Sequence, residues 1–288
     1  MKKIYLQTLV VILVCVSQAA NAQYSYTEAY FSAEELPNPL KWLPAPPDTT
    51  SAAFMYDLSQ YMWGKEQRHD PERAEIAIRD AVFGVQTIID EFSEPFGLQI
   101  SQEETPEIYK VLAEGTMTCV NICAIPKYHY MRKRPFDRLK ETSLTPDDEA
   151  HLQRSGSYPS GHTILGWSAA LLLMEINPDR ADTLLARGYM YGESRVIVGV
   201  HWRSDVEAGR LVASVAYARL HTSERFLEQM KKARAEFKQK MAELQDIEVI
   251  PSDSIIAGDA REYTLSGTKA TPSSRGIIVS KNRKTVRR

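Results

Sequence analysis

The sequence predicts an all-α fold, and three observations support this. Apolar residues recur at helical spacing over most of the chain, as in the segment that follows Pro71. Few stretches show the alternation of apolar and polar residues that is typical of strands. Helix N-terminal signals also recur, as in Thr145-Pro146-Asp147-Asp148, where proline and acidic residues favour a first turn. We therefore expect a single helical domain.

The first 22 residues have the pattern of a cleavable signal peptide. Two lysines precede a mostly apolar stretch at 4–16, and Ala20-Asn21-Ala22 has the form of a cleavage site. The apolar stretch is too short to cross a bilayer core of about 30 Å, which argues against a membrane anchor. Cys15 raises the alternative of a lipoprotein, but Val14 is bulky where such signals carry a small residue. We expect cleavage after Ala22 and a periplasmic or secreted protein.

The mature domain is expected to span residues 23–245. It begins with a proline-rich arm, 36–47, that should lie extended over the domain. Helices are expected at 51–66, 71–91, 106–122, from about 145, and at 163–176, 182–196, 205–220 and 224–244. No stretch after the signal peptide reads as long and apolar enough to cross a membrane, so we expect no stable membrane insertion.

The last segment, 246–288, is rich in Ser, Thr, Gly and Lys and ends in a basic cluster. Such a composition is typical of a disordered tail. A surface-binding tail is the alternative reading of the basic end.

The formal net charge of −2 gives no global field that would attract nucleic acid. Any anion site must therefore be built locally from clustered cations. Cys119 and Cys123 are four residues apart, a spacing that allows a disulfide on a helix, although two buried thiols explain them equally well. No second Cys or His pair stands at metal-ligand spacing, so no metal site is expected.

Three blocks of polar residues carry the chemistry. In the first, Lys127 and Arg134 enclose further basic residues and Pro135 follows. Taken alone, such a run is usually a solvated basic stretch.

The second block, Gly156–Thr163, ends a loop and opens an apolar helix. The unpaired N–H groups and partial positive charge of a helix N-terminus favour an anion. Ser160 can offer a hydroxyl, Gly161 lets the backbone approach an oxyanion closely, and His162 would face the bound group. The plain alternative is an ordinary N-cap.

The third block contains Arg195, His201 and Asp205. His201 and Asp205 are four residues apart, so on a helix they would share a face. A carboxylate bonded to one imidazole nitrogen leaves the other nitrogen as a nucleophile or base. A surface His–Asp pair beside a structural Arg is the alternative.

Together, the blocks read Lys-x6-Arg-Pro, then Pro-Ser-Gly-His, then Ser-Arg-x5-His-x3-Asp. This pattern resembles the type 2 phosphatidic acid phosphatase (PAP2) superfamily, which also contains the vanadium haloperoxidases. The longer string Gly-Ser-Tyr-Pro-Ser-Gly-His-Thr is similar to that of the bacterial class A non-specific acid phosphatases. The likeness runs from about Leu43 to about Phe237.

The resemblance implies a role for each motif residue. His201 would attack phosphorus, Asp205 would orient it, and His162 would protonate the leaving oxygen. The phosphoryl oxygens would be held by Lys127, Arg134, Ser160, Gly161 and Arg195. Such a site needs no cofactor and should be inhibited by vanadate, and three fixed cations can stabilise transferring phosphoryl charge without a metal.

Three other functions are alternatives to a phosphomonoester hydrolase with phosphotransferase side activity. A vanadium haloperoxidase would use the same cradle, but those proteins are usually much longer. An integral lipid phosphatase needs several spanning helices. An exported phosphate-binding protein needs neither two histidines nor Asp205. Small phosphomonoesters are the expected substrates, and the resemblance implies a homo-oligomer.

Overall fold

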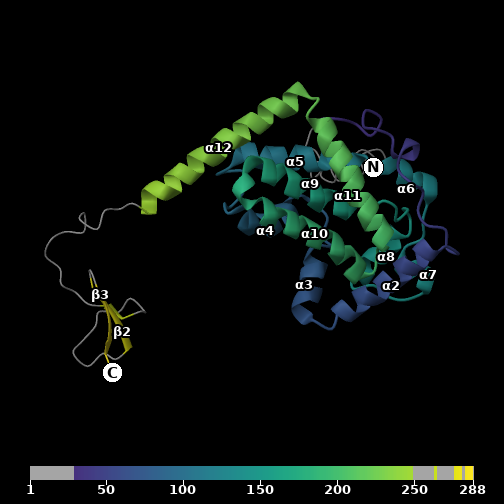
Figure 1. The fold of residues 1–288 in the computed structure, drawn as a ribbon, viewed down its shortest axis with the longest axis horizontal. Coiled ribbons are helices and arrows are strands. Elements are labelled where there is room, and N and C mark those ends of the chain that lie inside the picture. Colours follow the sequence, from purple (N-terminus) through teal and green to yellow (C-terminus); the bar gives the residue numbers. More distant parts are fainter. Residues whose placement is uncertain (1–28, 249–262, 265–275, 281–282, 288) are drawn as a thin grey trace, which may run out of the picture. The chain divides into compact units, whose positions relative to one another are not determined.

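The computed structural model describes residues 29–248, 263–264, 276–280 and 283–287 (Figure 1). The predicted signal peptide, 1–22, lies outside the described residues. The chain divides into two compact units, Met1–Gln239 and Lys240–Arg288. Within residues 29–239 the structure contains helices and no strand, which confirms the all-α prediction for this part of the chain.

The helices of the domain follow one another with short connections. Their bounds are η1 (Pro39–Lys41), α2 (Ala52–Gln67), α3 (Pro71–Arg79), α4 (Val85–Phe96), α5 (Pro106–Asn121), α6 (Ala124–Tyr130), α7 (Pro135–Leu139), α8 (Pro146–Leu152), α9 (Gly161–Ile176), η2 (Pro178–Arg180), α10 (Ala181–Val198), α11 (Arg203–Leu220) and α12 (Glu224–Glu248).

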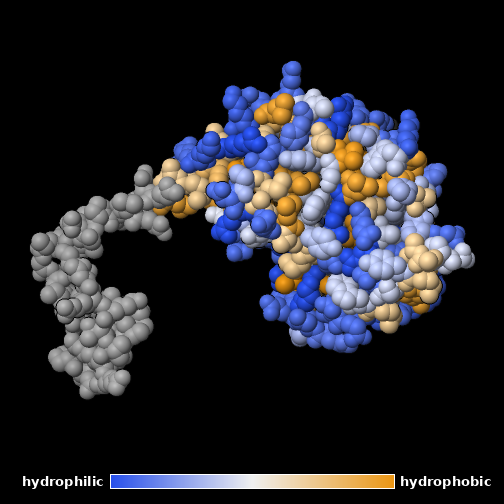
Figure 2. All heavy atoms as spheres, viewed as in Figure 1, coloured by the Kyte–Doolittle hydropathy of each residue, from blue (hydrophilic) through white to orange (hydrophobic). Residues whose placement is uncertain are grey.

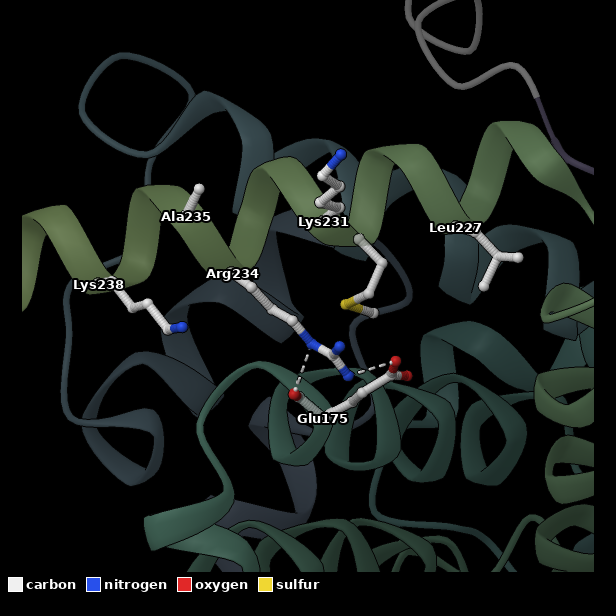
Figure 3. A pocket seen from close by; sticks show the side chains of 7 residues that line it. Glu175, Leu227, Lys231, Arg234, Ala235 and Lys238 are labelled. Atoms are coloured by element: carbon white, nitrogen blue, oxygen red, sulfur yellow. Dashed lines mark hydrogen bonds and ion pairs between the residues drawn. The ribbon is translucent and has the colours of Figure 1, made fainter.

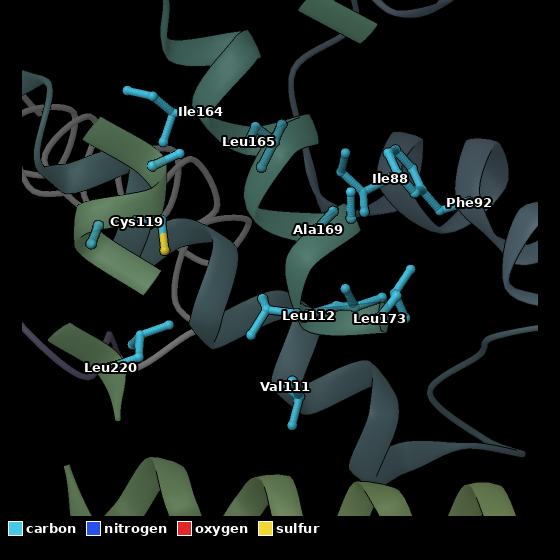
Figure 4. Close-up of a cluster of buried hydrophobic side chains, with 14 of the residues drawn as sticks. Ile88, Phe92, Val111, Leu112, Cys119, Ile164, Leu165, Ala169, Leu173 and Leu220 are labelled. Atoms are coloured by element: carbon cyan, nitrogen blue, oxygen red, sulfur yellow. The ribbon is translucent and has the colours of Figure 1, made fainter. Parts of the chain in front are cut away.

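Helix α9 is the centre of the domain because it is apolar on nearly all sides and contacts α4, α5, α10 and α11. Figure 4 shows its side chains Ile164, Leu165, Ala169 and Leu173 within the buried cluster. Residues from α4 and α5 complete this core, among them Phe92 and Leu112, both 0% exposed. On the face that Figure 2 shows, apolar residues lie among hydrophilic ones.

Two glycines allow α9 and α10 to pack closely. A Cβ at Gly166 would lie 2.5 Å from the ring of Tyr191, and a Cβ at Gly188 would lie 2.6 Å from Cβ of Ala170. Neither position has room for a larger residue. The close approach brings the C-terminal end of α10, which carries Arg195, into the same domain core as α9.

The single helix predicted for 71–91 is wrong, because the structure has α3 and α4 with a turn between them. Asp80 ends α3 with a carboxylate that is bound by α10, and Gly84 lies in an extended conformation before α4. Glycine is also a poor helix former. Two short helices, α6 and α7, were not predicted within the first basic block.

The proline-rich arm packs onto the domain. Leu36 and Leu43 are buried in the main core, and η1 forms one turn within the arm. The carbonyl oxygen of Pro44 accepts a hydrogen bond of 2.7 Å from the hydroxyl of Tyr158. The arm therefore supports the loop that precedes α9.

Among the described residues, one stretch, Pro106–Leu139, is long and apolar enough to cross a membrane by length and composition. This corrects the expectation that no stretch after the signal peptide is long and apolar enough. In the structure this stretch comprises α5, α6 and α7, and the residues of α5 that face α9, such as Ile108 and Leu112, are fully buried.

The second unit contains a small antiparallel sheet, β1 (Tyr263–Thr264), β2 (Gly276–Ser280) and β3 (Arg283–Arg287), in the order β1-β2-β3. At these residues the structure differs from the disorder expected for 246–288. The β-branched residues Ile277, Ile278 and Val279 favour strands, a local preference that the composition of the tail obscures.

Candidate active site

The three sequence blocks meet at the N-terminal end of α9. The N–H of Ser160 donates to the carbonyl oxygen of Asp205 over 3.0 Å, which joins the second block to the third. The ammonium of Lys127 donates to the carbonyl oxygen of Gly156 over 2.9 Å, which joins the first block to the second. The structure thus brings together residues from α6, α9, α10 and α11.

His201 lies in the turn between α10 and α11 and is only 2% exposed. Its Nδ1 lies 3.2 Å from Oδ2 of Asp205, and its Nε2 lies 3.0 Å from Nη1 of Arg134. A guanidinium can only donate, so Nε2 must accept and the imidazole proton must be on Nδ1. This tautomer presents the Nε2 lone pair toward the cationic side of the site.

The predicted shared helix face for His201 and Asp205 is wrong, because His201 precedes α11 and Asp205 lies in its first turn. The Asp205 carboxylate instead reaches back from the helix. Its Oδ2 also accepts a hydrogen bond of 2.8 Å from the N–H of Trp202, as in an N-terminal capping interaction. Asp205 therefore orients His201 and begins the helix at the same time.

Arg134 is buried, and its guanidinium contacts neutral groups. Nε donates to the carbonyl oxygen of Leu152 over 2.9 Å, and Nη1 donates to that of Val200 over 3.1 Å. Nη2 lies 3.3 Å from the hydroxyl of Ser155. Burial lowers the pKa of Arg134 to about 10, so the side chain remains cationic at neutral pH. Its charge is thus held in place beside His201.

Arg195, in the last turn of α10, is 1% exposed. Its Nε and Nη1 have no hydrogen-bond partner among the described residues. Burial lowers its pKa to about 10, which leaves the group charged at neutral pH. Unpaired buried donors are costly, so a buried guanidinium with two of them is well suited to receive an oxyanion.

Lys127 projects from α6 toward the loop before α9. Burial, followed by the charge of Arg134, lowers its pKa to about 8. Gly161 lies beside it, since a Cβ at Gly161 would be 3.8 Å from Cε of Lys127. The ammonium therefore adds a third positive charge next to the first N–H groups of α9.

Ser160 is the N-cap of α9. Its hydroxyl oxygen accepts hydrogen bonds from the N–H of Thr163 over 3.3 Å and from the Thr163 hydroxyl over 2.9 Å. Among the contacts of the described residues, the Ser160 hydroxyl acts only as an acceptor. Its own proton can therefore be donated to an anion at the helix N-terminus.

His162 is oriented by a backbone carbonyl. Its Nε2 lies 2.9 Å from the oxygen of Ala81, and since a carbonyl only accepts, Nε2 carries the proton. The ring of Phe83 packs edge-on against the imidazole, with 4.9 Å between ring centres. Nδ1 is thereby left as the nitrogen that can exchange a proton with a ligand.

The turn that provides this carbonyl is attached to α10 by Asp80, which is fully buried. The carboxylate binds Arg187 through two hydrogen bonds, of 2.5 and 3.2 Å. The hydroxyl of Ser194 donates to the same carboxylate over 2.6 Å. Asp80 thus holds Ala81, and through it His162, relative to the residue that precedes Arg195.

Both histidines resist protonation in the unliganded site. Burial is the largest cause, and it holds the pKa of each imidazole well below 6.5. Arg195 contributes further at His162, and Arg134, Lys127 and Arg195 do so at His201. Arg134 and Arg195 thus disfavour protonation of both imidazoles, and Lys127 disfavours that of His201.

The structure also reveals residues that the sequence analysis missed. Arg132 lies in the first basic block, whose alternative interpretation was a solvated stretch, but its side chain is 9% exposed and bridges Asp57 and Asp205. Asp57 could have been found, because it shares the buried stripe of α2 with Phe54 and Tyr61 at helical spacing. The Ala81 carbonyl is a backbone group and has no sequence signature.

Cys123 lies beside the site, since a Cβ at Gly161 would be 3.8 Å from its Sγ. Cys119 and Cys123 are free and buried, which corresponds to the alternative of two thiols. Burial raises the pKa of Cys119 to about 12, so it remains a neutral thiol. His69 is exposed, and Nε2 of His221 lies 3.0 Å from Oε2 of Glu175.

A cavity of about 340 Å³ lies between the end of α9 and α12, and none of the site residues lines it (Figure 3). Arg234 crosses it to bind Glu175, with 2.7 Å between Nη2 and Oε1. Its remaining lining consists of Leu227, Met230, Lys231, Ala235 and Lys238.

Comparison with known proteins identifies the family of the chain. A model of the PAP2 superfamily matches residues 109–226, which include all eight predicted site residues. Non-specific acid phosphatases are similar to the chain: that of Providencia stuartii is 43% identical over 199 residues (69% of this chain, 80% of the relative), and that of Salmonella typhimurium is 40% identical over 223 residues (76% and 89%). An acid phosphatase of Zymomonas mobilis is 32% identical over 220 residues (76% and 83%). The chain therefore belongs to the non-specific acid phosphatases of the PAP2 superfamily.

Proposed function

We propose that this protein is an acid phosphatase that hydrolyses small phosphomonoesters to an alcohol and inorganic phosphate through a phosphohistidine. The names of its relatives support the overall reaction. The observation that carries the proposal is the buried guanidinium of Arg195, whose Nε and Nη1 have no partner among the described residues. Its charge, with those of Arg134 and Lys127, lowers the pKa of His201.

In the first step, the Nε2 lone pair of His201 attacks phosphorus. Nη1 of Arg134, which lies 3.0 Å from Nε2 in the unliganded site, would then donate to a phosphoryl oxygen instead. The N–P bond forms as the ester P–O bond breaks, and the electrons of that bond go to the leaving oxygen. His162 supplies a proton from Nδ1, so the alcohol leaves neutral.

In the second step, His162, now neutral at Nδ1, takes a proton from water. The water oxygen forms a bond to phosphorus while the N–P electrons return to Nε2 of His201. Phosphate is released, and His162 is again protonated. Lys127, Arg134 and Arg195 stabilise the charge on the phosphoryl oxygens in both steps, with Ser160 and the N–H of Gly161. An alcohol in place of water would give phosphotransfer.

The electrostatics of the site favour activity at acidic pH. The lowered pKa of His201 keeps Nε2 unprotonated into the acidic range. His162 must carry a proton in the complex, and a bound phosphate dianion raises its pKa from the low value of the free site. The activity profile should therefore be bell-shaped and acidic.

Three fixed cations perform the role that a metal ion has in other phosphatases, so we propose a metal-independent reaction that vanadate inhibits. The predicted signal peptide supports action outside the cytoplasm, in the periplasm or the medium. A homo-oligomer remains a prediction from the resemblance.

The test is a panel of aryl, sugar and nucleoside phosphates, assayed with purified mature protein at pH 5 to 8 with and without chelator. We expect hydrolysis of several substrates, unchanged by EDTA and inhibited by vanadate. Phosphate binding without turnover would contradict the enzyme, and restoration of chelated protein by a divalent ion would contradict the metal-independent reaction.

A further inference from the structure

We propose that Arg132, held by Asp57, is a positioning residue that limits how strongly Asp205 supports positive charge on His201, and thereby keeps the phosphohistidine labile. The consequence for phosphoenzyme turnover rests on the proposed function. The arrangement itself rests on contacts among described residues.

Arg132 connects two buried carboxylates. Its Nη1 lies 2.5 Å from Oδ1 of Asp205, and its Nη2 lies 2.7 Å from Oδ2 of Asp57. Both carboxylates are 0% exposed. Since Oδ2 of Asp205 binds His201, the groups His201, Asp205, Arg132 and Asp57 form a continuous chain in which imidazole, carboxylate, guanidinium and carboxylate follow one another.

Ser204 closes this chain onto the backbone. Its N–H and hydroxyl donate to the two oxygens of Asp57 over 2.8 and 2.6 Å. Nη1 of Arg132 donates to the Ser204 hydroxyl over 2.8 Å. Because Ser204 precedes Asp205, Asp57 ties α2 to the turn of α11 that orients the nucleophile. Hydrogen bonds from Arg132 and Ser204 thus fix the position of the Asp57 carboxylate.

The charge of Arg132 acts on His201 through Asp205. A free carboxylate beside Nδ1 would stabilise an imidazolium strongly in a buried site. Arg132 binds the other carboxylate oxygen of Asp205, and its positive charge partly neutralises that carboxylate. Asp205 therefore still orients the His201 ring but stabilises a positive charge on it less strongly. Asp57 acts in the opposite sense, because its negative charge offsets that of Arg132.

This balance matters for the second step of the reaction. In the phosphoenzyme Nε2 is bonded to phosphorus and the imidazole carries positive charge. When water attacks, the N–P electron pair returns to Nε2, and a less basic nitrogen is the better leaving group. A strongly supported imidazolium would make the phosphohistidine too stable, so Arg132 favours its hydrolysis.

Arg132 differs from the other charged groups around His201. Arg134 before α7 lies 3.0 Å from Nε2, and Asp205 from α11 lies 3.2 Å from Nδ1. The other charged or titratable groups that interact with the imidazole are Lys127 from α6, Arg195 from α10 and His162 from α9. Burial and then Arg134, Lys127, Arg195 and Arg132 lower the pKa of His201. Both Nη atoms of Arg132 bind carboxylates, so its substitution leaves the phosphate-holding groups in place.

The test uses two substitutions that should act in opposite directions. In Arg132→Gln, the pKa of His201 should rise, the acidic limb of kcat/KM should move up by about one pH unit, and phosphoenzyme breakdown should slow ~10-fold. In Asp57→Asn, the acidic limb of kcat/KM should move to lower pH, because the charge of Arg132 is no longer offset. Phosphoenzyme breakdown should be as fast as in the wild type or faster. Rapid-quench kinetics and NMR titration of His201 measure these quantities.

Matched variants separate charge from structure. Lys133→Gln removes an adjacent charge whose side chain is 64% exposed, and it should shift nothing. Arg132→Lys keeps the charge and should retain most of the low pKa. The double variant Arg132→Gln/Asp57→Asn removes both charges and should return the limb toward that of the wild type. The double variant also allows the effect of the Arg132 charge to be measured if Arg132→Gln alone does not fold.

Shifts of the same sign in the two single variants, or an unmoved His201 pKa in folded Arg132→Gln, would overturn the proposal. If Arg132→Gln does not fold, the comparison is between Arg132→Gln/Asp57→Asn and Asp57→Asn. A His201 pKa that is clearly higher in the double variant supports the proposal, and equal pKa values in the two overturn it. A wild-type protein without phosphoenzyme would instead contradict the proposed function, and the NMR titration would still decide the role of Arg132.

Discussion

The Nε2 atom of His162 lies 2.9 Å from the carbonyl oxygen of Ala81, in the turn between α3 and α4. This contact fixes which imidazole nitrogen is free for proton transfer. The turn is itself attached to α10 through Asp80. The interruption of the predicted long helix is therefore part of the proposed proton-transfer apparatus.

Substitution of Asp80 should weaken this arrangement and the fold together. In Asp80→Asn, the buried Arg187 guanidinium loses one of its two charged partners and keeps Glu91, which should lower the free energy of unfolding by about 2 kcal/mol. Urea denaturation measures the change. Lys140→Gln, which removes a 76% exposed cation paired with Asp137, is the control and should cost less than about 1 kcal/mol. Equal losses in the two variants would show that Asp80 is not a buried structural clamp.

Removal of the proposed general acid should depend on the leaving group. In His162→Ala, the first-turnover rate should fall by about 10²–10⁴-fold on an alkyl phosphate, because an alkoxide leaves poorly without a proton. The fall should be much smaller on nitrophenyl phosphate, whose leaving group departs without protonation. Rapid-quench measurement of both substrates provides the comparison, and an equal defect on the two would contradict the assigned role.

Phosphate affinity should decline above about pH 8. The pKa of Lys127 is lowered to about 8, so its ammonium is present below that pH and is lost above it. Calorimetric titration should show a dissociation constant that rises about tenfold per pH unit between about pH 8 and 9.5. Lys127→Arg keeps its charge over this range, so its phosphate dissociation constant should depend much less on pH. A wild-type constant that is unchanged up to pH 9.5 would exclude Lys127 from phosphate binding.

Acidification should destabilise the unliganded fold. The folded pKa of His162 and of His201 is well below 6.5, so the unfolded state binds more protons as the pH falls through 6.5. Stability should be retained above that pH and lost below it, by up to about 1.4 kcal/mol per pH unit for each imidazole.

Denaturation of His162→Gln at pH 7.5 and 5 measures this contribution, because the variant has one fewer group to protonate. It should lose less stability on acidification than the wild type does. Phosphate at 100 times its dissociation constant should restore about 2.7 kcal/mol in the wild type. A wild type and variant that respond identically to pH would show that His162 titrates normally.

Much of the site could be predicted because its side chains carry distinctive chemistry at fixed spacings. The cations and histidines of the three blocks meet as expected. The chain of contacts behind His201 could not be predicted, because Arg132 resembles its exposed neighbours in sequence and its partner Asp57 lies 75 residues away. A charged residue on the otherwise apolar stripe of α2 was the available signal.

The fold was predictable in class and less so in detail. The bounds predicted for helices α9, α10 and α11 lie within two residues of those observed. The break after α3 depends on a buried contact between Asp80 and Arg187, 107 residues apart, which local periodicity does not reveal. Likewise, α6 and α7 are too short for a helical pattern to distinguish them from a basic loop.

The central claim is that His201 forms a covalent bond to phosphorus, and trapping the phosphoenzyme tests it most directly. Protein quenched within the first turnover of a ³²P-labelled substrate should carry an acid-labile, alkali-stable phosphoryl group, which mass spectrometry of peptides should locate on His201. His201→Ala should carry none. Label on another residue, or label retained in His201→Ala, would contradict the account.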